Sequence, residues 1–168
     1  TKPFGFMPFY PGPGLGGHCI PIDPFYLTWK AHEAGVKTRF IELAGEVNQS
    51  MPEYVVHIVA KALNAAEKSI RSSRILILGL AYKSNVDDTR ESPSFKLIEL
   101  LSEEGAIIDY YDSHVDKIPK IRKYPELSGK KSVEWNEESV RGFELVLVST
   151  AHDSVDYQEL GQWAKVVV

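Results

Sequence analysis

The chain has 168 residues, of which 43% are hydrophobic, 25% charged and 11% aromatic, a composition that is typical of a globular protein and excludes disordered, collagen-like and coiled-coil chains. Its formal net charge of −4 disfavours a nucleic-acid partner, because proteins that bind phosphate backbones usually carry a basic surface. The apolar runs are far shorter than the roughly 20 residues that cross a bilayer, so we expect no membrane partner and a cytoplasmic location.

The first 17 residues are rich in glycine, proline and aromatic residues, and this density of helix and strand breakers predicts a loop. Because a domain does not usually begin with exposed aromatic side chains, we expect the chain to be a fragment of a larger protein that covers them. After the loop, Asp23 as N-cap and Pro24 at the first helical position predict a short helix that ends at Gly35.

A second helix is predicted by apolar residues that recur at spacings of three and four from Val47 to Leu63. We expect Pro52 to lie in its first turn or to kink it. The broad apolar face suits packing against another helix, such as one from a second subunit, and so predicts a homodimer that forms through this helix.

The pattern changes at Arg74, where strands begin to alternate with helices. A helix is predicted to start at Ser92 and Pro93 and to stop at Gly105. The predicted strands cover residues 75–78, 106–111 and 144–149, and another begins at residue 166. This alternation predicts an α/β fold, with a helical segment over residues 1–72 followed by a doubly wound parallel sheet over residues 73–168.

Residues 12–17 match G-x-G-x-x-G letter by letter, but this fingerprint binds a pyrophosphate only when it joins a buried strand to a helix. A loop precedes it here, so we set the dinucleotide interpretation aside. The glycines predict either a close backbone approach to a ligand or a mobile loop.

Cys19 is the single cysteine, which excludes an internal disulfide and a cysteine-rich zinc site, and the scattered histidines predict no metal site. Its position before a helix favours a reactive thiolate, whereas inert packing is the commoner fate of a lone cysteine. Asp23 is either a base beside the sulfur or the N-cap of the helix. His18 is adjacent to Cys19, and adjacent side chains usually diverge.

Lys83 and Arg90 follow the first predicted strand, close to the helix start at Ser92. Ligands of open α/β sheets bind at the carboxyl ends of the strands, and helix N-termini favour anions, so this turn suits a phosphate or diphosphate. The alternative is a solvated loop in which Lys83 and Arg90 pair with Asp87 and Asp88.

Two stretches together carry a family resemblance: YPGPGLGGHCIPIDP at residues 10–24 and LAYKSNVDDTRESP at residues 80–93. They closely resemble the nucleotide-sugar 6-dehydrogenases, the UDP-glucose/GDP-mannose dehydrogenase family, and most closely the branch that acts on UDP-N-acetylhexosamines. The resemblance implies a Rossmann-like second domain and oxidation of the sugar C6 alcohol to a carboxylate with two NAD⁺ in turn.

The same resemblance implies roles for individual residues. Cys19 would attack the intermediate aldehyde and carry the sugar as a thiohemiacetal and then a thioester, with Asp23 assisting proton transfer and water attack. The binding roles that it implies are sugar-loop contacts for Tyr10 and Leu15, the sugar site for Gly16 and Gly17, the UDP part for Lys83, and the NAD pyrophosphate for Arg90.

Two departures distinguish the chain from the UDP-glucose enzymes that it resembles. Ile22 stands where those enzymes have Lys, and the loop upstream of the cysteine offers only Lys2 where they carry Arg. Both favour an N-acetylated sugar and leave its epimer open. The NAD-binding domain of the family and its catalytic Lys and Asn have no counterpart here, so we expect the chain alone to be inactive.

Two alternatives to the dehydrogenase remain at this point. The chain could be a non-catalytic nucleotide-binding or oligomerisation module. A cysteine-dependent hydrolase or transferase would need a histidine against Cys19, and His152 is the distant candidate.

Overall fold

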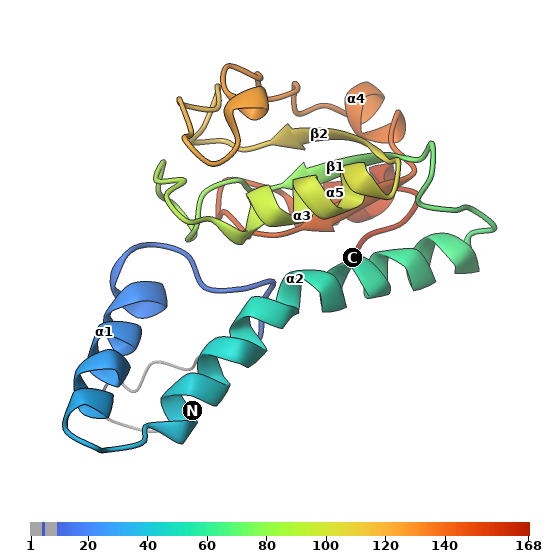
Figure 1. Cartoon of the computed structure of the whole chain (residues 1–168). Helices are drawn as coiled ribbons and strands as arrows, with labels where there is room; N and C mark the ends of the chain where they lie inside the picture. The colour runs from blue at the N-terminus through green and yellow to red at the C-terminus, as the bar shows by residue number, and fades with distance from the viewer. Residues whose placement is uncertain (1–4, 6–9) are drawn as a thin grey trace.

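The computed structural model describes Gly5 and residues 10–168 (Figure 1). Residues 1–4 and 6–9 of the predicted N-terminal loop, including Lys2, lie outside the described residues, and residues 10–17 form neither helix nor strand, as predicted. The helices are α1 (Cys19–Glu33), α2 (Arg39–Ala65), α3 (Pro93–Glu103), α4 (Glu137–Arg141) and α5 (Tyr157–Trp163), with a 3-10 turn η1 (Pro125–Leu127). The strands are β1 (Arg74–Leu78), β2 (Ile107–Tyr111) and β3 (Leu145–Val148).

The three strands form a parallel sheet in the order β2-β1-β3, which confirms the predicted α/β fold with its parallel sheet. In the register of the sheet, Leu76 of β1 lies between Asp109 of β2 and Val146 of β3. The strand expected from residue 166 is reduced to one bridge, in which Val167 pairs with Val146. The division of the chain near Ser72 stays a prediction.

The two faces of β1 pack into separate cores, as expected for a strand that is buried on both sides. Ile75 and Ile77 lie in the core that α2 and α3 cover, whereas Leu76 and Leu78 lie in the core that α4 and α5 cover. Figure 1 shows α3 in front of the sheet and α2 running past it. The sheet is therefore the middle of three layers.

Helix α1 begins one turn earlier than predicted, at Cys19, and His18 occupies the N-cap without a side-chain hydrogen bond. The prediction that Asp23 caps the helix is wrong, because Asp23 and Pro24 lie inside it. The first N–H groups of a helix have no helical partner, so Pro21 is tolerated in the first turn and does not delay the start. The predicted stop is confirmed, since the helix ends at Glu33 and Gly35 has a φ of +76°.

Helix α2 has Pro52 in its interior, so the first-turn alternative for Pro52 is wrong and the kink stays a prediction. Because proline lacks an N–H, the carbonyl of Asn48, four residues earlier, loses its helical donor. Toward the C-terminal end of the helix, Val59 and Leu63 are fully buried in the core shared with α3. Part of the apolar face that predicted a second subunit is thus covered within the chain, whereas Val47 and Tyr54 stay exposed.

Gly79 follows β1 at a point where no side chain fits. Its φ is +87°, and a Cβ atom there would lie 2.1 Å from the carbonyl oxygen of Thr150. We therefore expect Gly79→Ala to lower the free energy of unfolding by about 3 kcal/mol, through backbone strain and displacement of the residues that follow β3. Urea unfolding of the chain measures this effect.

The matched control is Gly161→Ala, in α5, where a Cβ atom meets nothing within 4 Å. It should leave stability unchanged or raise it by up to about 1 kcal/mol, because alanine favours the helix. Equal effects of the two substitutions would contradict the assigned clash at Gly79.

Candidate functional site

The site is built where two loops meet. We call residues 10–18 the glycine loop and residues 80–92, between β1 and α3, the basic turn. The backbone N–H of Gly17 donates to the carbonyl of Arg90 at 3.0 Å. A Cβ atom on Gly16 would lie 2.5 Å from Cβ of Tyr82 and 3.0 Å from the carbonyl oxygen of Glu91, so only glycine allows this close approach.

Helix α2 holds the other side of the glycine loop. The N–H of Leu15 donates to Oδ1 of Asn48 at 2.9 Å. Asn48 lies one turn before Pro52, where the helical hydrogen bonding is interrupted. The two motifs that are about 70 residues apart in the sequence are therefore fixed against each other and against one helix.

Cys19 and Asp23 are both exposed and lie four residues apart at the start of α1. Residues at this spacing share one face of a helix, one turn apart. Cys19 is the first residue of α1, where the free N–H groups of the helix favour negative charge. The structure therefore leaves the sulfur open to reagents and places a carboxylate on the same helix face.

A cleft of about 1170 Å³ separates the helices α1 and α2 from the start of α3 and residues 119–124. Of the predicted site residues, Leu15 and Arg90 line it, as do His18 and Ile20 on either side of Cys19. Within the described part of the chain, its other cationic lining residues are Lys96, Lys120, Arg122 and Lys123. The positive charge of these lining residues suits an anionic ligand.

Arg90 is held by Asp88 inside the basic turn. Nε of Arg90 donates to both carboxylate oxygens of Asp88, at 2.8 and 2.9 Å. The pKa of Asp88 falls to about 2, first because of this side-chain hydrogen bond and also because the Arg90 backbone N–H donates to it and His18 lies nearby. The Arg90 side chain is still 63% exposed, so its charge remains accessible from the cleft.

The N-terminus of α3 is tied to the carboxyl ends of β1 and β3. Ser92 caps the helix, as predicted, by accepting a hydrogen bond from the Ser94 N–H. The buried Ser94 hydroxyl contacts the Gly79 carbonyl at 3.0 Å and the Ser149 hydroxyl at 2.7 Å. After β1 the chain continues to α3 on one face of the sheet, and after β3 it continues to α5 on the other face. The basic turn thus lies beside the point where the two connections diverge, which is where open α/β sheets bind ligands.

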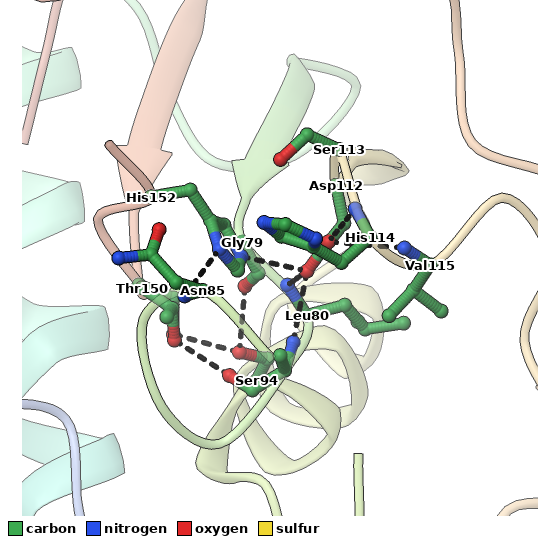
Figure 2. Close-up of polar contacts among 12 residues, drawn as sticks. Gly79, Leu80, Asn85, Ser94, Asp112, Ser113, His114, Val115, Thr150 and His152 are labelled. Atoms are coloured by element: carbon green, nitrogen blue, oxygen red, sulfur yellow. Dashed lines mark hydrogen bonds and ion pairs between the residues drawn. The ribbon is translucent and has the colours of Figure 1, made fainter. Parts of the chain in front are cut away.

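A buried polar cluster that was not predicted from the sequence lies at the same edge of the sheet (Figure 2). Asp112 follows β2 and accepts hydrogen bonds from the backbone N–H groups of Leu80, Ala81, His114 and Val115. His152, beyond β3, contacts Asp112 through Nε2 at 3.1 Å, and both side chains are completely buried. The sequence signal that could have indicated this cluster is Asp112, an aspartate directly after the predicted strand at residues 106–111.

The ionisation of Asp112 is set by two opposing effects. Burial, the largest influence, would raise its pKa, but the donating backbone N–H groups together with His152 hold the pKa below its ordinary value. A carboxylate that receives this many donors is stabilised in its charged form. His152 has both ring nitrogens engaged, by Asp112 and by Asn85, and so is not available as a base for Cys19.

Metal binding and membrane crossing are not supported by the residues that the structure describes, which are residues 5 and 10–168. In this part of the chain, no three histidine, cysteine, aspartate or glutamate side chains gather closely enough to hold a metal ion. None of its helices combines the length and the apolar character that a membrane crossing requires.

The chain is similar to known proteins along most of its length. Residues 76–168 match a model described as UDP-glucose/GDP-mannose dehydrogenase family, UDP binding domain, and residues 1–50 match that family's central domain. A UDP-N-acetyl-D-mannosamine dehydrogenase of Methanococcus maripaludis is 40% identical over 144 residues, which are 86% of this chain and 30% of that protein.

Another relative, a UDP-N-acetyl-D-glucosamine 6-dehydrogenase of Pseudomonas aeruginosa, is 34% identical over 72% of this chain and 28% of that protein. Among solved structures, a UDP-D-ManNAc dehydrogenase of Pyrococcus horikoshii has a TM-score of 0.75 and 28% identity, over 95% of this chain and 35% of that one. The chain thus spans about 30% of the length of these curated relatives. These matches confirm the resemblance that the two motifs carry.

Proposed function

Since the chain belongs to the UDP-glucose/GDP-mannose dehydrogenase family, we propose that it is the cysteine-bearing and nucleotide-sugar-binding part of a UDP-N-acetylhexosamine 6-dehydrogenase. The relatives named for UDP-N-acetyl-D-mannosamine and UDP-N-acetyl-D-glucosamine support this substrate class. The reaction converts the C6 alcohol of the sugar to the uronic acid. The observation that carries the proposal is the hydrogen bond from Gly17 to Arg90, which joins the thiol's loop to the basic turn.

The chemistry of the chain centres on Cys19. Its thiolate adds to the carbon of the C6 aldehyde, and the carbonyl oxygen takes up a proton, which gives a thiohemiacetal. Loss of hydride from that carbon, together with the hydroxyl proton, gives a thioester. Water then attacks the thioester and gives one proton to Asp23, on the same face of α1, while the sulfur leaves as thiolate. The carboxylic acid that results loses its remaining proton to solvent and is released as the carboxylate.

NAD, when bound, supplies the hydride acceptor for both oxidations. Within this chain, Arg90 fits the pyrophosphate of NAD, because its guanidinium is exposed and lines the cleft. Asp88 occupies one edge of the guanidinium, and the N–H groups away from that edge remain free to donate to a phosphate. Residues 10 and 11, directly before the G-x-G-x-x-G match, are not in a strand, so the described residues do not give residues 12–17 the strand-to-helix setting of a dinucleotide fingerprint. The remaining contacts with NAD would come from outside this chain.

The diphosphate of the UDP-sugar is proposed to bind at the basic turn. Lys83 would donate to it, and the N-terminus of α3 adds a favourable dipole at the same edge of the sheet. Gly16 and Gly17 bring the backbone of the glycine loop against the turn, next to the place where the sugar would lie. Tyr10 and Leu15, both exposed, are proposed sugar-loop contacts.

A homodimer through α2 is part of the same proposal. The apolar side chains left exposed on α1 and α2 support it, among them Trp29, Phe40, Leu43, Val47 and Tyr54. Exposed apolar side chains in this number are typical of an interface between subunits.

Calorimetric titration of the purified chain with UDP and with UDP-N-acetylglucosamine tests the proposed function. We expect both to bind, and we expect Lys83→Met to weaken UDP binding about tenfold or more, because a charge-assisted contact to the diphosphate is lost. Lys165→Met is the matched control. Nζ of Lys165 lies 3.9 Å from Oε1 of Glu144, outside the basic turn, so this substitution should leave the affinity unchanged. Absence of heat with both nucleotides would refute the nucleotide-sugar site.

A further inference from the structure

The hydrogen bonds of His152 fix its tautomer. Nδ1 lies 3.0 Å from the backbone nitrogen of Asn85, which is a donor only. Nδ1 must therefore accept, and the ring proton resides on Nε2, which donates to Oδ2 of Asp112. His152 is thus a neutral imidazole. Figure 2 shows its ring between Asn85 and Asp112, which belong to two different loops.

One end of this bridge is rigid. Asp112 receives four backbone N–H groups, two on each carboxylate oxygen, at distances between 2.6 and 3.1 Å. Two of these donors, Leu80 and Ala81, lie at the start of the basic turn. The position of the imidazole is therefore set by the carboxyl ends of β1 and β2.

The other end of the bridge is the basic turn itself. Asn85 has a φ of +61°, and its side chain exchanges two hydrogen bonds with Asp153, one from Nδ2 to a carboxylate oxygen at 2.8 Å and one from the Asp153 N–H to Oδ1 at 3.0 Å. His152 and Asp153 thus hold one residue of the turn through its backbone and its side chain together. Lys83 lies two residues earlier.

We propose that His152 is a positioning residue for diphosphate binding: by accepting the Asn85 N–H, it fixes the part of the basic turn that carries Lys83. The inference rests on the proposed function, in which Lys83 meets the diphosphate. His152 acts through Asn85 and Lys83 and does not itself contact the ligand. Without the acceptor, the Asn85 N–H has no partner in its present position, and the turn relaxes to satisfy it with water.

Two substitutions separate the two contacts of the imidazole. Asparagine places an amide oxygen near the position of Nδ1 and keeps an acceptor for Asn85, whereas glutamine reaches the position of Nε2 and keeps the donor to Asp112. We expect His152→Asn to bind UDP within about twofold of the unchanged chain, and His152→Gln to bind it about tenfold more weakly, the factor that corresponds to one lost hydrogen bond. A purely structural role predicts the reverse order, because the buried carboxylate is the costlier group to leave without its donor, and the reverse order would overturn the inference.

Combination with Lys83→Met shows whether the effect passes through the lysine. If it does, His152→Gln weakens UDP binding about tenfold in the unchanged chain and less than about twofold in the Lys83→Met background. An equal effect in both backgrounds would overturn the positioning role and leave the UDP site standing. If the unchanged chain does not bind UDP, the proposed function fails, and the inference fails with it.

A measurement on the unchanged chain covers the case in which a variant does not fold. The amide proton of Asn85 should exchange with solvent more slowly than that of its exposed neighbour Ser84, and the addition of UDP should slow it further. Exchange of Asn85 as fast as that of Ser84, with and without UDP, would overturn the inference.

Discussion

Uronic acid formation should fall by about 10³-fold or more when Cys19 is replaced by serine in the enzyme that we propose contains this chain. Without the thiolate, the aldehyde has no covalent route to the thioester, and removal of a catalytic nucleophile typically costs several orders of magnitude. The first oxidation does not need the sulfur, so the aldehyde should accumulate. Mass spectrometry of the sugar product measures both outcomes.

The exposure of Cys19 makes this experiment easy to interpret. Because the thiol is exposed on α1, Cys19→Ser should change the free energy of unfolding by less than about 0.5 kcal/mol. Ile20→Val, at the neighbouring exposed position, is the control for local disturbance and should leave the rate within a factor of a few. An unchanged rate of uronate formation in Cys19→Ser would remove the sulfur from the mechanism and favour a non-catalytic module.

The largest loss of stability is expected from Asp112→Asn, at about 3 kcal/mol in the free energy of unfolding measured with urea. Oδ1 receives two backbone donors, and Oδ2 receives two more together with Nε2 of His152. Whichever position the new NH₂ group takes, it faces buried N–H donors, and the charge that they stabilise is gone.

Asp109→Asn is the matched control on the strand that precedes Asp112. Asp109 is 27% exposed and pairs with Arg74 at 3.6 Å and with Lys130 at 3.0 Å. Its substitution should cost less than about 1 kcal/mol, as is usual for partly exposed ion pairs. If Asp112→Asn were equally mild, the buried cluster would not be the anchor that we describe.

The pH dependence of stability should report on Asp112 as well. The pKa of Asp112 is lowered in the folded chain, so its ionised form contributes stability that is fully present above the unfolded value of about 3.9. This contribution is lost as the pH falls through the lowered folded value. Stability of the unchanged chain should therefore decline below about pH 4 more steeply than that of Asp112→Asn.

Local sequence signals predicted the second half of the fold well. The cap at Ser92, the proline after it and the stop at Gly105 predicted α3, and a run of aliphatic residues predicted β1. Neighbouring residues are enough to determine these features. The start of α1 was predicted too late, because the Asp23–Pro24 signal is equally compatible with a helix that began one turn earlier.

Long-range features of the site could not be read from the sequence. Asp112 and His152 are 40 residues apart, and their contact depends on β2 and β3 flanking β1 in the sheet. The docking of Gly16 against Tyr82 likewise depends on how α2 folds back over α3. The residues of both motifs were predicted, whereas the polar cluster that supports one of them was not.

For the proposed UDP-sugar site, the hydrogen bond from Gly17 to Arg90 has a consequence for which ligands fit. The bond restrains the distance between the basic turn and the sulfur of Cys19, because either loop would lose the contact if it moved away from the other. A nucleotide sugar with one phosphate in place of two would be anchored at the turn and yet fall short of the thiol. The enzyme would then discriminate between ligands by length as well as by the identity of the sugar.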